Sequence, residues 1–211
     1  MPAEESVFVV DDDEAARESL AWLLTSVGYS VVCYPSANAF LENYDGRAGC
    51  LILDVRMPGM SGLNLQQELQ KHNWPLSSIL VTGHGDVPMA VAAMRAGALD
   101  FLQKPFNNQS LLDRTEEALS RARALRHAAS AKSEIETRFG RLTCREREVA
   151  WLVFAGKPNK VIADNLSLSC KTVEAHRASM MAKMQTHSVA DLVQKLSLLR
   201  PSETALASND L

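Results

Sequence analysis

The sequence of 211 residues has few cysteines and no long apolar run. Its four cysteines include no CxxC pair, so their spacing indicates neither a zinc site nor a disulfide framework, and free thiols are expected. No apolar run approaches the roughly 20 residues that span a bilayer. The acidic N-terminal residues carry no signal-peptide core. We therefore expect a cytoplasmic protein with no membrane partner.

Positive charge is scarce in the first part of the chain and abundant in the last. Residues 1–126 carry 10 Lys and Arg against 16 Asp and Glu, whereas residues 139–200 carry 10 against 5. This asymmetry predicts two domains, of which the second faces a polyanion. We place the first domain at 1–121, an Ala- and charge-rich helical linker at 122–138, the second domain at 139–200 and a polar tail at 201–211.

Five short apolar runs, each followed by apolar residues at helical spacing, fill the first domain. The predicted strands are Val7–Val10, Val31–Tyr34, Cys50–Leu53, Ile79–Val81 and Asp100–Gln103. Five such β–α units in series predict an α/β domain, with a doubly wound five-stranded parallel sheet flanked by helices.

Polar side chains stand where these strands end. Asp11 and Asp12 follow the first strand, Asp54 the third, and Thr82 and Lys104 the fourth and fifth. If the strands are ordered 2-1-3-4-5, an order taken from known doubly wound proteins, the ends meet at one edge. Clustered carboxylates need a cation, and Mg²⁺ binds through few carboxylates. Lys104 and the metal could offset the charge of a phosphoryl group that Thr82 bonds and Asp54 attacks.

Each of these residues also has an ordinary structural explanation. A strand-terminal Asp is most often a helix cap or a turn residue, and an Asp run can be charge at a helix start. Thr82 could be turn chemistry and Lys104 a surface charge. Because all of them fall at the right strand ends, phosphoryl chemistry is the favoured interpretation.

Four motifs resemble the receiver domain of two-component response regulators, over roughly residues 5–126. They are Val9-Val10-Asp11-Asp12, Leu53-Asp54-Val55-Arg56-Met57-Pro58-Gly59, Val81-Thr82-Gly83-His84 and Lys104-Pro105-Phe106. The resemblance implies a flavodoxin-like sheet and phosphorylation of Asp54 by a sensor histidine kinase. It also implies a Mg²⁺ ion, for which Mn²⁺ can substitute, bound by Asp12, Asp54 and the backbone carbonyl of Arg56, with Asp11 in support.

The same resemblance assigns a switch. Thr82 and Lys104 would grip the phosphoryl group, the Lys104–Pro105 peptide would be cis, and Thr82 with Phe101 would transmit the change. Phe101 carries no hydroxyl, which argues against a switch that needs a tyrosine hydrogen bond. A further hypothesis has Arg56 and His84, each two residues past a pocket residue, flanking the attacking water and setting the phosphoryl lifetime.

The second domain shows only short helical patterns. Thr143 and Glu146 predict a capping box at the first. Further helices are predicted near 162–166, 172–184 and 189–199, the last ending near Arg200 because Pro201 follows. Two helices joined by a short turn suit a helix-turn-helix. A small helical bundle for protein contacts is the alternative, and the basic residues favour DNA; these are Lys160, Lys171, Arg177 and Lys183.

This small all-α domain resembles the LuxR-type four-helix DNA-binding domain over about residues 139–200. The motifs are Leu142-Thr143-Cys144-Arg145-Glu146-Arg147-Glu148-Val149, then Asn159-Lys160-Val161-Ile162-Ala163, then Lys171-Thr172-Val173-Glu174-Ala175-His176-Arg177. The resemblance implies base-edge contacts from Lys171, Val173, Glu174 and Arg177, and phosphate contacts from Lys160, Thr172, His176 and Lys183. Together the two domains are most similar to the FixJ branch of the NarL/FixJ family.

We therefore expect a response regulator that acts as a transcription factor and not as an enzyme. Phosphorylation of Asp54 would promote a homodimer, through the helix near 87–96 and strand five, and sequence-specific binding to double-stranded promoter DNA. RNA polymerase is a further expected partner. Two alternatives stay open: a phosphatase that uses aspartyl phosphate, for which no second catalytic Asp after Asp54 is evident, and a phosphorylation-independent DNA-binding protein.

Overall fold

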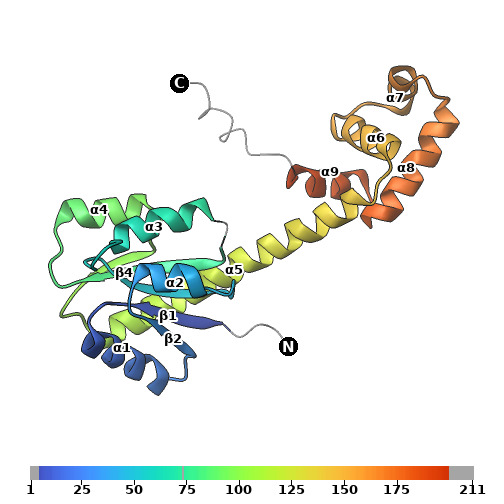
Figure 1. The fold of residues 1–211 in the computed structure, drawn as a ribbon. Helices are drawn as coiled ribbons and strands as arrows, with labels where there is room; N and C mark the ends of the chain where they lie inside the picture. The colour runs from blue at the N-terminus through green and yellow to red at the C-terminus, as the bar shows by residue number, and fades with distance from the viewer. Residues whose placement is uncertain (1–4, 73, 200–211) are drawn as a thin grey trace. The chain divides into compact units, whose positions relative to one another are not determined.

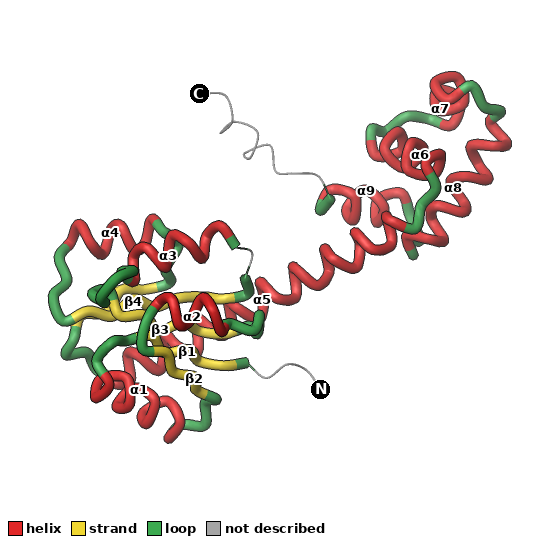
Figure 2. The backbone as a smooth tube through the Cα atoms, in the orientation of Figure 1, coloured by secondary structure: helices red, strands yellow, loops and turns green. Residues whose placement is uncertain are grey.

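The first part of the chain forms a parallel sheet with helices on both faces (Figures 1 and 2). The computed structural model describes residues 5–72 and 74–199 and divides into two compact units, Met1–Ala128 and Ala129–Leu211. The five strands have the order β2-β1-β3-β4-β5, which confirms the predicted topology. They are β1 Ser6–Val10, β2 Val31–Tyr34, β3 Gly49–Asp54, β4 Leu76–Thr82 and β5 Asp100–Gln103.

Apolar side chains cover both faces of the central strands. On one face, Val7 and Val9 pack with the helices Glu14–Ser26 and Asn108–Gly140; on the other, Phe8 and Val10 pack with the helix Ala37–Asn43. Every residue of β1 and β3 is buried, which explains why these strands read as unbroken apolar runs. The helices are α1 Glu14–Ser26, α2 Ala37–Asn43, α3 Gly62–Lys71, α4 Val87–Arg95 and α5 Asn108–Gly140.

Helix α5 has the helical conformation that the sequence predicted for the linker. It continues through the predicted linker at 122–138 as one helix. Leu111 and Ala118 are buried against the sheet, and Ile135 is buried in the core of the second unit. Between them, all eight residues from 127 to 134 are exposed. This stretch is therefore held as a helix by its own backbone hydrogen bonds and not by packing.

The second unit consists of helices around one apolar core. They are α6 Cys144–Phe154, α7 Asn159–Leu166, α8 Cys170–Met184 and α9 Val189–Ser197. The predicted capping box of Thr143 and Glu146 is present at α6. Helix α9 ends at Ser197, before the predicted end near Arg200; that residue and the tail 201–211 lie outside the described residues. Among the helices of residues 5–72 and 74–199, none is long and apolar enough to cross a membrane.

Candidate functional site

One lysine lies between two carboxylates at the carboxyl edge of the sheet. Lys104 Nζ is 2.8 Å from Asp11 Oδ2 and 2.9 Å from Asp54 Oδ1. Asp11 follows β1, Asp54 ends β3, and Lys104 follows β5. The peptide bond between Lys104 and Pro105 is cis, as predicted. The Lys104 N–H also donates to the carbonyl of Thr82 at 2.7 Å. The structure thus brings together residues that lie up to 93 positions apart.

Burial and charge oppose each other in this pocket. Burial raises the pKa of Asp54, although hydrogen bonds from Lys104 and from the Arg56 N–H, at 2.7 Å, act to lower it. Burial would lower the pKa of Lys104, but its bonds to Asp11 and Asp54 outweigh that effect and raise it. One ammonium therefore serves two carboxylates, and the exposed Asp12 adds a third acidic side chain nearby in sequence. The pocket keeps a net negative charge, which favours a cation.

The donor chemistry fits Mg²⁺. Within the described part of the chain, no group of three or more His, Cys, Asp and Glu side chains forms a ready-made metal cage. Mg²⁺ needs none, since it binds through one or two carboxylates and keeps several waters. Asp11 and Asp54 supply buried carboxylate oxygens, and Asp12 supplies an exposed one. The backbone N–H of Arg56 donates a hydrogen bond to Asp54, and binding of Mg²⁺ by the Arg56 carbonyl stays a prediction.

The two predicted switch residues, Thr82 and Phe101, meet at a glycine. The buried Thr82 hydroxyl accepts a hydrogen bond from the His84 N–H at 3.3 Å and lies 3.5 Å from the His84 carbonyl. Phe101 packs beside a cluster that includes Ala93 of α4. A Cβ at Gly85 would lie 2.8 Å from the Phe101 ring and 3.1 Å from the Thr82 methyl. Sequence reasoning missed Gly85, although it stands three residues after Thr82.

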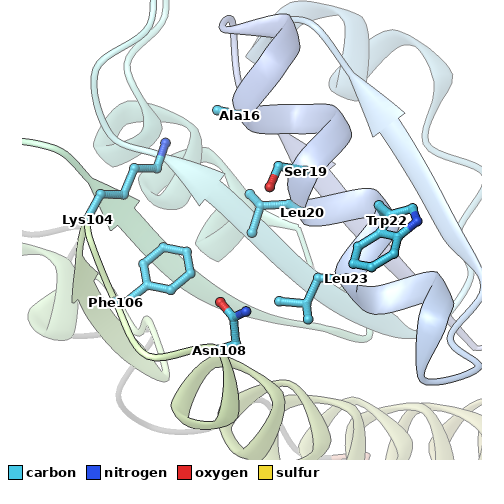
Figure 3. A pocket seen from close by; sticks show the side chains of 8 residues that line it. All are labelled: Ala16, Ser19, Leu20, Trp22, Leu23, Lys104, Phe106 and Asn108. Atoms are coloured by element: carbon cyan, nitrogen blue, oxygen red, sulfur yellow. The ribbon is translucent and has the colours of Figure 1, made fainter.

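An apolar pocket of about 260 Å³ opens beside Lys104 (Figure 3). Leu20, Leu23 and Trp22 of α1 line it together with Phe106, which follows β5. The Trp22 side chain is 75% exposed, which is unusual for so large an apolar group. The sequence pattern gave no sign of this pocket, because it assigned α1 only a core-facing stripe.

Helices α7 and α8 carry the residues that were predicted to contact DNA. Lys160, Lys171 and Glu174 are exposed, whereas Thr172, His176 and Arg177 are half-buried. Val173 is fully buried, so the expectation that it faces a base edge is wrong. It lies on the stripe of α8 that also carries the buried Met180 and Met184, and helical spacing points all three at the core.

Lys183 has a protein partner that the sequence pattern did not reveal. Its Nζ lies 2.6 Å and 2.8 Å from the two carboxylate oxygens of Glu146, which is 3% exposed. Burial would raise the pKa of Glu146, but bonds from Lys183, Ser179 at 2.6 Å and the Thr143 N–H lower it to about 2. Lys183 therefore neutralises a buried carboxylate, and its contact with a DNA phosphate stays a prediction.

Comparisons with known proteins agree with both halves of this geometry. The family model described as "Response regulator receiver domain" matches residues 7–116, and "Bacterial regulatory proteins, luxR family" matches residues 141–196. Transcriptional regulatory protein FixJ of Azorhizobium caulinodans is 44% identical over 92% of each chain. Response regulator protein TodT of Pseudomonas putida is 43% identical over 93% of this chain and 87% of that one.

The chain is a response regulator of the NarL/FixJ family. Solved response regulators have the same fold. StyR has a TM-score of 0.78 at 43% identity and covers 92% of this chain and 99% of its own. Full-length FixJ from B. japonicum has a TM-score of 0.55 at 39% identity, covering 94% and 98%. This response regulator thus joins a receiver domain, of a kind that generally binds Mg²⁺ at its acidic pocket, to a LuxR-type DNA-binding domain, and is a transcription factor.

Proposed function

We propose that Asp54 of this response regulator is phosphorylated by a sensor histidine kinase and that the phosphoryl group controls DNA binding. The observation that carries the proposal is Lys104, which bridges Asp11 and Asp54 at 2.8 and 2.9 Å. A buried carboxylate beside an ammonium is a nucleophile with a cation already in place for the charge it gains.

The chain's own residues divide the work of transfer. A carboxylate oxygen of Asp54 attacks the phosphorus, the bond from phosphorus to the donor's nitrogen or oxygen breaks, and the donor leaves with that electron pair. Lys104 then shares its N–H donors with a phosphoryl oxygen. Asp12 and Asp54, with Asp11 in support, would hold a Mg²⁺ ion, which would offset negative charge on the transferred group. The transfer step ends at an acyl phosphate on the protein itself, so we propose a regulatory role in place of a separate enzyme activity.

The added charge is read by the switch residues. A phosphoryl group brings about −1.5 to −2 charges, and we propose that it draws the Thr82 hydroxyl away from His84, so that Phe101 repacks against α4. Helix α4 exposes Val87, Val91 and Met94, at 77%, 43% and 48%. Positions three and four apart share one face of a helix. This apolar face of α4, with β5, is the surface proposed for the homodimer.

A dimer places two recognition helices α8 on two half-sites of promoter DNA. We propose that Lys171, Glu174 and Arg177 contact base edges and that Lys160, Thr172 and His176 contact phosphates. RNA polymerase is the proposed partner of the bound dimer.

The test is treatment with acetyl phosphate and Mg²⁺, followed by mass spectrometry and footprinting. We expect one phosphoryl adduct, located on Asp54, together with a dimer and a protected DNA site. Asp54→Asn is the control and gains none of these. Mn²⁺ in place of Mg²⁺ is expected to support the adduct. Equal footprints for the variant and the treated wild type would instead support a phosphorylation-independent DNA-binding protein.

A further inference from the structure

A polar contact between α7 and α8 has no place in the DNA contacts proposed so far. Asn159 Oδ1 accepts a hydrogen bond of 2.8 Å from Arg177 Nη1. Asn159 is the first residue of α7, and Arg177 lies in the middle of α8. Both side chains are half-buried. The contact ties the start of the first helix of the helix-turn-helix to its recognition helix.

Arg177 stands at the edge of the core-facing stripe of α8. Val173 and Met180, four residues before it and three after it, are fully buried. The aliphatic stem of an arginine can lie along such an apolar surface while its guanidinium reaches the rim. At that rim the guanidinium needs a polar acceptor, and Asn159 provides one.

The position of Asn159 makes this use of its side chain notable. Asn at a helix start usually caps the first turn from the N-cap position. Here Pro158 occupies the N-cap of α7, and Asn159 is one residue further on. Its amide oxygen therefore serves the neighbouring helix in place of its own.

We infer that Asn159 is a positioning residue for DNA recognition, because it fixes the guanidinium of Arg177 so that its other donors meet a base edge. This inference rests on the proposed function. The planar fork of an arginine reads guanine with two hydrogen bonds, and a fork already fixed loses less conformational freedom on binding. Asn159 contacts no DNA in this scheme and acts through Arg177.

The experiment uses the full chain, treated with acetyl phosphate and Mg²⁺. The wild type selects duplexes from a randomised library, and dissociation constants are measured for the most enriched duplex and for each of its single-base-pair variants. We expect Arg177→Ala to abolish the preference at one base pair. Asn159→Ala should weaken the preference at the same base pair and lower affinity for the enriched duplex about three- to tenfold.

Controls separate positioning from folding. Asn159→Asp keeps the acceptor oxygen and should keep the base preference. Asn165→Ala, an exposed position on the same helix, should change nothing. In the Arg177→Ala background, Asn159→Ala should have no further effect on the base preference, which a double-mutant cycle would test. If Asn159→Ala lowers the unfolding temperature, Asn159→Leu, of similar size, replaces it.

The outcomes distinguish the two claims. A uniform loss of affinity in Asn159→Ala, with base preferences unchanged, would overturn the positioning role. Arg177→Ala with every base preference intact would overturn it too, while DNA binding by the regulator would stand. If the treated wild type enriches no duplex, the proposed function itself fails, and the inference with it.

Discussion

At the scale of single residues, the chain places its most consequential charges in buried pairs. Asp54 and Glu146 are 7% and 3% exposed, and each meets one lysine. The two carboxylates nevertheless shift in opposite directions: the pKa of Asp54 is raised and that of Glu146 is lowered. Lys104 is divided between two carboxylates, whereas Lys183 serves Glu146 with both oxygens engaged. A lysine shared between two carboxylates thus leaves negative charge in the acidic pocket, whereas a lysine paired with one carboxylate neutralises it.

Asp54→Asn should raise the unfolding temperature of the first unit at pH 7 in the absence of Mg²⁺. A carboxyl whose folded pKa lies above its unfolded value costs stability once the pH exceeds both, and an amide does not titrate. The difference in unfolding temperature between the variant and the wild type should narrow as the pH falls toward the ordinary pKa of an aspartate, about 4. Calorimetry across this pH range checks it. A lower unfolding temperature for the variant at pH 7 would mean that the bonds from Lys104 and Arg56 outweigh burial.

Glu146→Gln should destabilise the second unit by about 1–3 kcal/mol at neutral pH, because it removes a charged acceptor from Lys183. The lowered pKa means that this stability is complete above the unfolded value, about 4.3, and is lost as the pH falls toward about 2. The gap between wild type and variant should therefore close over that interval.

Urea unfolding measures this gap, with Trp151 as the reporter in a Trp22→Phe, Trp74→Phe background. Glu148→Gln is the matched control, since Glu148 is 46% exposed in its pair with Arg145. A surface pair of this kind contributes at most about 1 kcal/mol. A constant gap down to pH 2 for Glu146→Gln would contradict the assigned pKa.

At the scale of elements, apolar patterns in the sequence predicted the positions of helices and strands but not the contacts between helices. The predicted strands Val31–Tyr34 and Asp100–Gln103 match the structure. Spacing also predicted α8, whereas the base-edge contact of Val173 came from the family resemblance and is contradicted by its burial. The pairing of Lys183 with Glu146, 37 positions away, and the Asn159–Arg177 contact depend on how helices pack, which no local pattern carries.

Helix α5 should exchange its amide hydrogens unevenly. Residues 127–134 are all exposed, whereas Leu111, Ala118 and Ile135 are buried in the cores of their units. Helical hydrogen bonds without packing open at low free-energy cost. We expect amides in 127–134 to exchange much faster than those near Ala118, as hydrogen-exchange mass spectrometry measures. Equal protection along the helix would show that this stretch is covered in solution.

At the scale of the whole molecule, two units of opposite charge share one chain. The acidic pocket lies in the first and the basic helices in the second, so we expect each unit to be stabilised by a different ligand. A ligand that binds only the folded form raises the unfolding temperature of the unit that holds it. In the function that we propose, phosphorylation in the first unit changes DNA binding by the second.

Mg²⁺ with acetyl phosphate should raise the unfolding temperature of the first unit by several degrees and leave the second unchanged. The enriched DNA duplex should do the opposite. Trypsin should cut first near the exposed Lys132 and release two fragments that keep these separate responses. Calorimetry before and after cleavage checks this. A single transition that responds to both ligands in the cut protein would show that the units do not fold independently.

The Thr82 hydroxyl makes only long contacts with the backbone of His84, at 3.3 Å from its N–H and 3.5 Å from its carbonyl oxygen. Hydrogen bonds this long lie at the weak end of their range. A contact that contributes less than about 1 kcal/mol changes the ratio of resting to active conformations by at most about fivefold. If Thr82 is the switch residue that we propose, this contact alone cannot hold the regulator in its resting state, and background transcription without a signal would have to be suppressed by other contacts.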